Sequence, residues 1–304
     1  MTETKAGFER LRPLMFSIAY RMLGSVADAE DVVQDAMVRM YSDAPADVRN
    51  PEAYATTVTT RLAIDALKSA RRRREQYVGV WLPEPLVKTA EADPAQLAMV
   101  GHDVSVALLV LLEQLTPVER AVFLLREVFE LEYVEIATVV GKSESNCRQL
   151  MRRARRRLDE GGSRYEPATN DHDRLAARFL TAVEEGDLEQ LVSMLAEDAA
   201  VYGDGGGKAP ALTQPAQGAV RVARLLVGLS RQAERFRFRM QPTMVNGQLG
   251  ALVLDEVGRL LAVMSVEVAG SRVVAVRNQI NPDKLRHLGE VGDLAGMWTS
   301  RRPR

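Results

Sequence analysis

The sequence predicts a multidomain protein in which two all-α blocks precede a separate α+β domain. Three observations support this class. Apolar residues recur at the helical spacing of three and four through residues 8–74 and again through residues 103–160. Pro83 and Pro85 interrupt the periodicity between these blocks, because proline cannot continue a helix. After about residue 231, apolar and polar residues alternate, which is typical of strands.

The first block should contain three helices. One apolar stripe occupies residues 8–22 and a second occupies residues 32–41. Ser25, with Asp28 three residues later, predicts a capping box at the start of the second helix. After a turn-rich loop, a third helix is expected over residues 52–74, ending in four consecutive arginines.

The second block carries a helix-turn-helix pattern. Thr116 and Glu119 predict a capped helix start. Further along, Gly141 supplies a tight turn, Ser143 caps the next helix, and the small side chain of Ala137 allows the two helices to cross closely. The alternatives are a recognition helix that enters a DNA major groove and an ordinary helical hairpin with a solvated basic face.

Charge is unevenly distributed along the chain. The whole chain of 304 residues has a net charge of −1, but residues 141–164 carry eight basic and three acidic residues, a net charge of +5. A second basic run covers Arg71 to Arg74. Two separate basic patches on a nearly neutral chain indicate local contact with a polyanion.

The last part of the chain has a mixed texture. Helices are expected at about residues 171–185, 187–196 and 217–231, with a glycine-rich loop before the third. The runs FRFRM, ALVLDEV, LLAVMSVEV and RVVAVRNQI then read as strands of an antiparallel sheet. Helices followed by such a sheet predict a separate α+β domain.

The composition limits the cellular compartments and the kinds of site that the protein can have. The longest apolar run, Val106 to Leu112, is far too short to span a bilayer, and the N-terminus has no hydrophobic signal core. The single cysteine, Cys147, lies on an apolar helix face and excludes an internal disulfide. We therefore expect a cytoplasmic protein with no membrane partner. Three scattered histidines give no metal-ligand spacing, so no metal and no cofactor are expected.

Two motif blocks resemble the extracytoplasmic-function (group IV) RNA polymerase sigma factors. SVADAEDVVQDAMVRMY and the following NPEAYATTVTTRLAIDALKSARRRRE look like sigma domain 2. The helix-turn-helix, preceded by LTPVERAVFLLREVFELEY, looks like sigma domain 4. The resemblance covers roughly residues 8–160, and nothing similar to sigma domain 3 lies between the blocks. It implies a promoter-specificity subunit of RNA polymerase rather than an enzyme, with core RNA polymerase and promoter DNA as partners.

The resemblance also implies three contact surfaces. Acidic and polar residues that would dock on core polymerase are Asp28, Glu30, Asp31, Gln34 and Asp35. Basic residues that would follow the phosphates at the −10 element are Arg61, Lys68, Arg71, Arg72, Arg73 and Arg74. Residues that would contact the −35 element are Ser145, Arg148, Gln149, Arg152, Arg153 and Arg156. The acidic surface could instead be a solvated helix face, and Tyr54 could stack on a base or belong to the core.

The remaining part resembles the SnoaL-like fold, a curved antiparallel sheet and helices that close a cone-shaped pocket. One group of extracytoplasmic-function sigma factors carries this extension with WLPEP, DGGGK and NPDKL motifs. The chain contains all three as Trp81, Leu82, Pro83, Glu84, Pro85, Asp204, Gly205, Gly206, Gly207, Lys208, Asn281, Pro282, Asp283, Lys284 and Leu285. DGGGK lacks the spacing of a nucleotide-binding loop, so it is either a contact with another segment or a plain flexible loop.

The resulting domain boundaries are 1–76 for sigma domain 2, 77–102 for a linker, 103–162 for sigma domain 4, 171–290 for the SnoaL-like domain and 291–304 for a tail. We expect the three motifs to meet and the last domain to control the sigma domains in cis. Deletion after about residue 165 should lower transcription, and removal from Asn281 onward should raise it. The alternative is a sigma-like regulator whose C-terminal domain senses a small-molecule ligand or keeps enzymatic activity.

Overall fold

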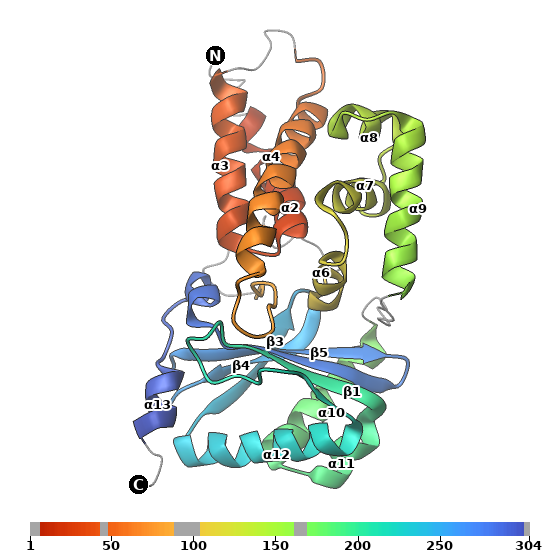
Figure 1. The fold of residues 1–304 in the computed structure, drawn as a ribbon. Coiled ribbons are helices and arrows are strands. Elements are labelled where there is room, and N and C mark those ends of the chain that lie inside the picture. The colour runs from red at the N-terminus through yellow and green to blue at the C-terminus, as the bar shows by residue number, and fades with distance from the viewer. Residues whose placement is uncertain (1–6, 43–47, 88–103, 161–168, 301–304) are drawn as a thin grey trace. The chain divides into compact units, whose positions relative to one another are not determined.

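The computed structural model describes residues 7–42, 48–87, 104–160 and 169–300 (Figure 1). The chain divides into two compact units. The first unit comprises Met1–Gln76, Asp93–Gly101 and Leu108–Ser163. The second unit comprises Tyr77–Ala92, His102–Ala107 and Arg164–Arg304. The WLPEP segment therefore belongs structurally to the C-terminal part of the chain.

Three helices form the first half of the first unit: α2 (Arg12–Leu23), α3 (Val26–Ser42) and α4 (Pro51–Arg74). Gly24 ends α2 in the left-handed region with φ 67°, where glycine has no steric penalty. The Ser25 hydroxyl then accepts the backbone N–H three residues later at 3.1 Å, as the capping pattern predicts. The helices pack on one another through buried apolar side chains, so the predicted periodicity is that of a shared core.

The second half of the first unit contains α6 (Val106–Leu112), α7 (Pro117–Glu127), α8 (Tyr133–Val140) and α9 (Glu144–Glu160). Gly141, with φ 65°, ends α8 and makes the turn into α9. This is the predicted helix-turn-helix. Its small core consists of Val122, Leu125, Ile136, Val139, Cys147, Leu150 and Met151.

Two local signals in this half behave as the sequence indicates. Thr116 and Glu119 form a complete capping box at the start of α7. Cys147 is fully buried in the helix-turn-helix core, and burial raises the pKa of its thiol above the ordinary value. A buried thiol with a raised pKa is a packing residue rather than a nucleophile.

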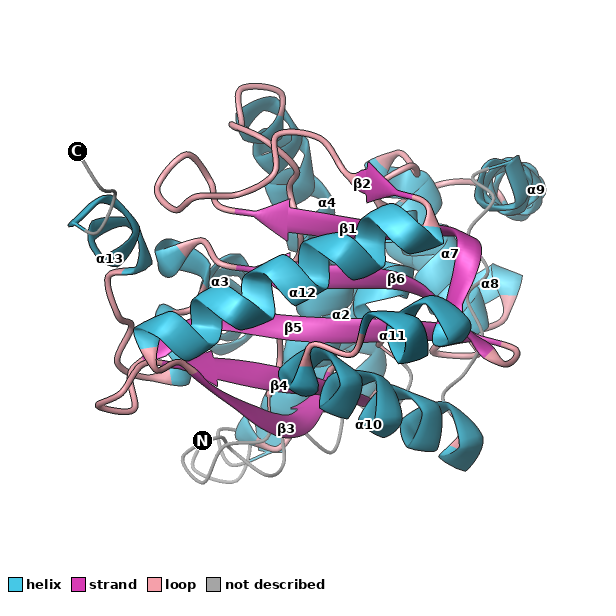
Figure 2. Cartoon of the chain, turned by 90° about the horizontal axis from the view of Figure 1, so that it is seen from below, coloured by secondary structure: helices cyan, strands magenta, loops and turns pink. Residues whose placement is uncertain are grey.

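The second unit is an α+β domain in which helices cover one face of a six-stranded sheet (Figure 2). The helices are α10 (Asn170–Glu185), α11 (Leu188–Met194) and α12 (Ala219–Phe236). The strands, in the order β2-β1-β6-β5-β4-β3, are β1 (Leu195–Asp204), β2 (Ala216–Gln217), β3 (Arg239–Val245), β4 (Gln248–Leu254), β5 (Leu260–Ala269) and β6 (Arg272–Gln279). The predicted fold class is therefore confirmed.

The sheet differs from the prediction in one respect, because it is mixed rather than wholly antiparallel. Strand β1, which the alternation pattern did not reveal, pairs with β6 in parallel, whereas the other neighbours pair antiparallel. Its sequence, LAEDAAVYGD, is rich in alanine and lacks regular alternation. Register shifts in β1, β4 and β5 interrupt the ladders, as β-bulges do where a sheet bends.

The chain after β6 contains the short helices η1 (Pro282–Lys284) and η2 (Arg286–Leu288) and then α13 (Leu294–Ser300). In the described parts of the chain, no helix has the length and apolar character needed to cross a membrane. Those same parts contain no group of three His, Cys, Asp or Glu side chains placed to hold a metal ion.

Candidate functional site

The outward face of α9 offers side chains suited to reading a base edge. Ser145, Gln149 and Arg152 are all exposed, and Arg152 has no hydrogen-bond or ion-pair partner among the described residues. Arg148 is more constrained, because its guanidinium pairs with Glu144 at 2.9 Å and lies 4.5 Å from the centroid of the Tyr133 ring. Arg152 is therefore the arginine of this face that a ligand meets unpaired.

Other arginines of α9 are engaged with carboxylates. Arg153 lies 3.8 Å from a carboxylate oxygen of Glu119, and Arg156 lies 3.7 Å from one of Glu160. Arg155 pairs with Glu127 at 2.7 Å. The high local charge of α9 is thus partly compensated within its own unit.

The acidic face of α3 is only partly free. Asp31, Gln34 and Asp35 are exposed, and Asp28 is half-buried in the first turn. Glu30 forms an ion pair with Arg12 of α2. Asp31 and Asp35, one helical turn apart, therefore form the accessible charged part of this face.

The basic residues of α4 are largely occupied inside the first unit. Arg61 donates to the carbonyl oxygens of Thr138 at 2.8 Å and Val139 at 2.9 Å, in the last turn of α8, where a cation is favoured. Arg71 donates to the carbonyl oxygens of Glu113, at 2.9 Å, and of Leu115.

The other basic residues of α4 differ in their exposure and in their partners. Lys68 pairs with Asp65 at 2.8 Å, and Arg72 is exposed. Arg74 forms an ion pair with Glu113. The side chain of Arg73 lies outside the described residues. The helix-turn-helix half of the unit thus supplies partners for Arg61, Arg71 and Arg74, and sequence reasoning had assigned all three to phosphates.

A buried charge cluster joins the two halves of the first unit. Arg120 of α7 is fully buried and donates to the carbonyl oxygens of Leu112 at 2.9 Å and Met22 at 2.8 Å. Its third contact is the Glu113 carboxylate, at 2.7 Å. Burial lowers the pKa of Arg120 to about 10 and acts to raise that of Glu113, but Arg120 and Arg74 outweigh it and hold the pKa of Glu113 below its ordinary value.

In the second unit, the three short motifs meet around one buried carboxylate. Asp204 has no exposed surface and accepts hydrogen bonds from the Tyr77 hydroxyl at 2.5 Å and the Leu82 N–H at 2.8 Å. The Lys284 ammonium lies 2.6 Å from the same carboxylate, and the Gln279 amide lies 3.3 Å from it. We define the Asp204 cluster as Tyr77, Leu82, Asp204, Gln279, Asn281 and Lys284.

Lys284 is the counter-ion of this cluster. Besides Asp204, it donates to the Leu82 carbonyl oxygen at 2.6 Å. Its ammonium lies 4.7 Å from the Tyr77 ring centroid and 4.3 Å from that of Trp81, which are cation–π distances. Burial, followed by the bond to Asp204, raises the pKa of Tyr77. The hydroxyl of Tyr77 therefore stays protonated and donates to the carboxylate.

Further contacts attach the segment Tyr77–Val87 along its length. Gln279 donates to the carbonyl oxygens of Leu82 and Pro83, at 3.3 and 3.2 Å. A ring nitrogen of His287 lies 2.8 Å from the carbonyl oxygen of Pro85. Val87 then pairs with Val245, so the segment adds a bridge to the edge strand β3. Sequence reasoning missed Tyr77, Gln279 and His287, because only the fold brings them beside WLPEP.

The glycines of DGGGK are required by close approach. Gly206 and Gly207 have φ 57° and 70°, a region that glycine adopts without penalty. A Cβ at Gly206 would also overlap the Asn281 amide and the Tyr77 hydroxyl. Lys208 pairs with Asp283 and not with Asp204. DGGGK is thus a contact loop, as one of the two sequence interpretations expected.

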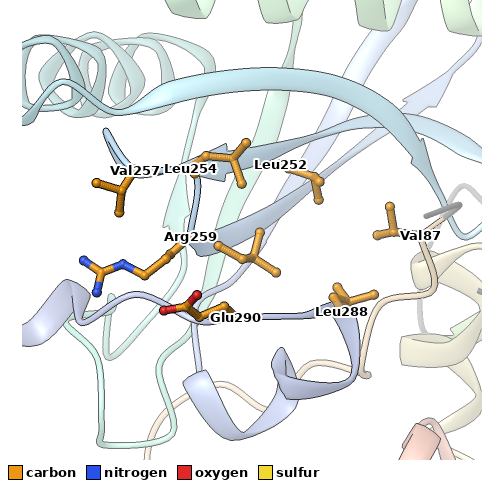
Figure 3. Close-up of a pocket in the computed structure, with 9 residues that line it drawn as sticks. Val87, Leu252, Leu254, Val257, Arg259, Leu288 and Glu290 are labelled. Carbon is orange, nitrogen blue, oxygen red and sulfur yellow. The ribbon is translucent and has the colours of Figure 1, made fainter. Parts of the chain in front are cut away.

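A cavity of about 300 Å³ lies beside the attached segment (Figure 3). Its aliphatic lining includes Val87, Leu252, Leu254 and Leu288, whereas Arg259 and Glu290 lie at one end. The hydrogen bond with Asp255, and then the charges of Asp255, Glu290 and Asp293, raise the pKa of Arg259. Arg259 is itself paired with Asp255 at 2.7 Å, so Glu290 supplies the uncompensated charge of the described lining at this end.

Comparison with known proteins matches each half of the first unit to a family model. Residues 8–73 match the family model of Sigma-70 region 2, and residues 105–158 match that of Sigma-70, region 4. The chain is 38% identical over 290 residues to the ECF RNA polymerase sigma factor SigJ of Mycobacterium tuberculosis, covering 91% of each chain. The chain belongs to the ECF RNA polymerase sigma factors.

The likeness of this sigma factor to SigJ extends through the second unit. The crystal structure of SigJ matches with a TM-score of 0.75 and 35% identity, over 92% of this chain and 98% of that one. The probable ECF RNA polymerase sigma factor SigI of the same species is 37% identical over 194 residues, covering 62% of this chain and 66% of SigI. The C-terminal unit has the SnoaL-like fold, and the function of the chain lies in transcription initiation.

Replacing the unpaired arginine of α9 should change promoter preference. We expect Arg152→Ala to cost about 1–3 kcal/mol in binding at one −35 position, as the loss of a bidentate base contact does. Arg156→Ala should instead weaken binding to all sequences and reduce the salt slope by about one. Holoenzyme binding to a library of −35 variants measures both effects. Equal, sequence-independent losses would contradict this assignment.

Proposed function

We propose that this sigma factor works with core RNA polymerase in the cytoplasm and docks through α3. The observation that supports this docking is the exposed pair Asp31 and Asp35 on the outward face of α3, whose opposite face is buried. Exposed carboxylates are available to a partner without any rearrangement of the core, and they attract a surface of complementary basic charge. Ser145, Gln149 and Arg152 of α9 would then read the −35 element, and the basic residues of α4 would follow the −10 phosphates.

Charge reversal on α3 tests this docking surface. Asp31→Lys combined with Asp35→Lys should weaken binding to core polymerase about tenfold or more, which corresponds to about 1.4 kcal/mol or more. The matched control is Glu185→Lys with Glu189→Lys, since both are exposed carboxylates of the other unit. Affinity is measured by titrating labelled core polymerase with each full-length protein. Unchanged affinity in the α3 variant would exclude α3 as the docking helix.

For the C-terminal domain we propose control of the sigma domains in cis through the Asp204 cluster. The supporting observation is that the chain leaving α4 is held by the C-terminal domain from Tyr77 to Val87. A segment fixed by hydrogen bonds to a folded domain no longer acts as free tether between the two sigma halves.

The length of a tether sets how readily its two ends meet or separate. A shorter free connection raises the effective concentration of one sigma half near the other, whereas release of Tyr77–Val87 lowers it. Arg61 and Arg71, whose partners lie in the helix-turn-helix half, would be freed for DNA when the halves separate, and Arg74 would keep its hydrogen bond to the Leu23 carbonyl oxygen. The Asp204 cluster would thus act as a brake on promoter engagement.

We also propose that the C-terminal domain acts without catalytic turnover. The buried carboxylate of Asp204 is committed to the Tyr77, Leu82 and Lys284 donors. His287 faces the Pro85 carbonyl oxygen. General acid–base catalysis needs groups that can exchange a proton with a substrate, and both groups serve the attached segment instead.

The cavity supports a second role, the sensing of a small molecule. It is at the lower end of the volumes typical of ligand pockets, and Val87 of the attached segment forms part of its wall. A ligand that fits would have an aliphatic body for Leu252 and Leu254 and a cationic end for the Glu290 carboxylate. Filling the cavity would stabilise the attached state of the linker.

n-Hexylammonium is a suitable probe of this cavity. We expect it to raise the Tm of the full-length protein more than n-hexanoate does at equal concentration, because a ligand that binds only the folded state stabilises it. Leu252→Trp, which fills the cavity, should abolish the difference. If both ions shift the Tm equally, or if the variant responds as the original does, the cavity is not a cation-binding site.

A further inference from the structure

Helix α12 carries a basic surface that neither the sheet packing nor the Asp204 cluster uses. Its inward face buries Val222, Ala223, Leu226 and Val227 in the domain core. Its outward face carries the exposed arginines Arg221, Arg224, Arg231 and Arg235. We define these four residues as the α12 arginine stripe (Figure 2 shows the position of α12).

The spacing of the stripe places all four arginines on one line. Intervals of three, seven and four residues keep them within an arc of about 80° on a helix with 3.6 residues per turn. The stripe is about 21 Å long at 1.5 Å per residue. Glu234, the only acidic residue between positions 219 and 239, lies outside this arc. The line facing solvent therefore contains no carboxylate of α12.

None of the four guanidinium groups has an ion-pair or hydrogen-bond partner in the described parts of the chain. This contrasts with α9, where five arginines pair with nearby glutamates. Residues 219–239 contain six arginines and one glutamate, a net charge of +5 in a chain whose total is −1. An exposed helix face needs polar residues for solubility, but it does not need four uncompensated like charges in line.

We propose that the α12 arginine stripe binds the phosphate backbone of duplex DNA. A duplex segment as long as the stripe carries about twelve phosphate charges, so a straight line of arginines meets a matching line of anions. DNA is favoured over other polyanions because the chain is a sigma factor, whose α9 already offers a basic face. The proposal thus rests on promoter binding by the sigma domains, and it adds a sequence-independent contact from the C-terminal domain.

The salt dependence of promoter binding tests the stripe. Holoenzyme is assembled from core polymerase and full-length protein in which Arg221, Arg224, Arg231 and Arg235 are all changed to Gln. If each arginine meets one phosphate, the slope of log K against log salt falls in magnitude by about 0.9 per residue, or about 3.6 in total. The affinity lost between 50 and 200 mM salt should then be about a hundredfold smaller for the variant.

Three controls separate the stripe from other causes. Arg174→Gln with Arg178→Gln removes two exposed positive charges from α10 of the same domain and should leave the slope unchanged. Half-stripe variants should each lower the slope by about half the full effect. The far-ultraviolet circular dichroism should be unchanged, because all four positions are exposed. Affinity for core polymerase is measured in the same proteins.

The outcomes are distinct. A slope equal to that of the original protein, or a fall shared by the α10 control, overturns the proposal. A loss of affinity for core polymerase with an unchanged DNA slope assigns the stripe to a protein partner and also overturns it. If Arg152→Ala and Arg156→Ala leave promoter binding intact, the α9 assignment fails, and this failure is read independently of the stripe.

Discussion

Glu113→Ala should destabilise the first unit by about 3 kcal/mol, the lower end of the range for removing one partner of a buried ion pair. The reason is Arg120, which has no exposed surface and would keep its charge without the one carboxylate that it contacts among the described residues. The lower end of the range applies because the Glu113 side chain is 24% exposed, so water partly replaces it. Arg74 would lose its ion-pair partner as well.

The pH dependence of this effect follows from the direction of the pKa shift. The pKa of Glu113 is lowered in the folded state, since Arg120 and Arg74 outweigh the opposing effect of burial. A group with a lowered folded pKa contributes stability above its unfolded pKa and loses it as the pH falls through the folded value. The difference in free energy of unfolding between the original protein and Glu113→Ala should therefore have its full size at neutral pH and decrease below about pH 4.5.

Hydrogen exchange of the α7 amides measures the effect, because it reports the opening of the first unit separately from the second. The control is Glu127→Ala, which removes an exposed pair with Arg155 and should cost less than about 1 kcal/mol. If the two variants exchange alike, the buried cluster does not hold the two halves of the unit together.

Asp204→Asn should release the attached segment Tyr77–Val87. The substitution keeps the shape of the side chain but leaves the Lys284 ammonium, which is 10% exposed, beside a neutral amide. Uncompensated buried charge costs several kcal/mol, so we expect exchange of the Leu82 amide to accelerate by about a hundredfold or more. The Leu82 N–H is a direct reporter, because it donates to Asp204 at 2.8 Å.

The chain offers a matched control for this substitution. Asp283→Asn makes the same chemical change to the exposed ion pair with Lys208, and it should leave Leu82 exchange nearly unchanged. Adding Lys284→Met to Asp204→Asn removes the unpaired charge and should restore part of the protection. Equal exchange in the Asp204 and Asp283 variants would mean that the cluster does not secure the linker.

The sequence predicted the elements whose signals are local. Capping at Thr116, the turn at Gly141 and the apolar stripes of the helices depend on residues within one or two turns. Strand β1 was not predicted, because its alanine-rich sequence lacks alternation and its parallel partner β6 lies some seventy residues later. Parallel pairing depends on tertiary structure that no short window contains.

The candidate sites show the same division. The three short motifs were identified from the sequence, but the sequence did not show which residues their charged groups would contact. In the structure both partners lie in NPDKL: Asp204 pairs with Lys284, and Lys208 pairs with Asp283. Arg61 is a similar case, because its partners are backbone carbonyl groups 77 and 78 residues away. Backbone carbonyl groups are present in every residue, so a sequence pattern does not show which of them will accept a hydrogen bond.

Promoter-driven transcription with purified core polymerase tests control in cis most directly. The proteins compared are the original chain, Asp204→Asn, Asp283→Asn, and the two truncations after residue 165 and before Asn281. Release of the linker predicts a severalfold rise for Asp204→Asn and for the chain ending before Asn281, and no change for Asp283→Asn. The chain ending at residue 165 should instead transcribe less, because it loses the whole domain that we expect to keep the two sigma domains correctly spaced. Equal transcription from all five proteins would contradict a regulatory role for the C-terminal domain.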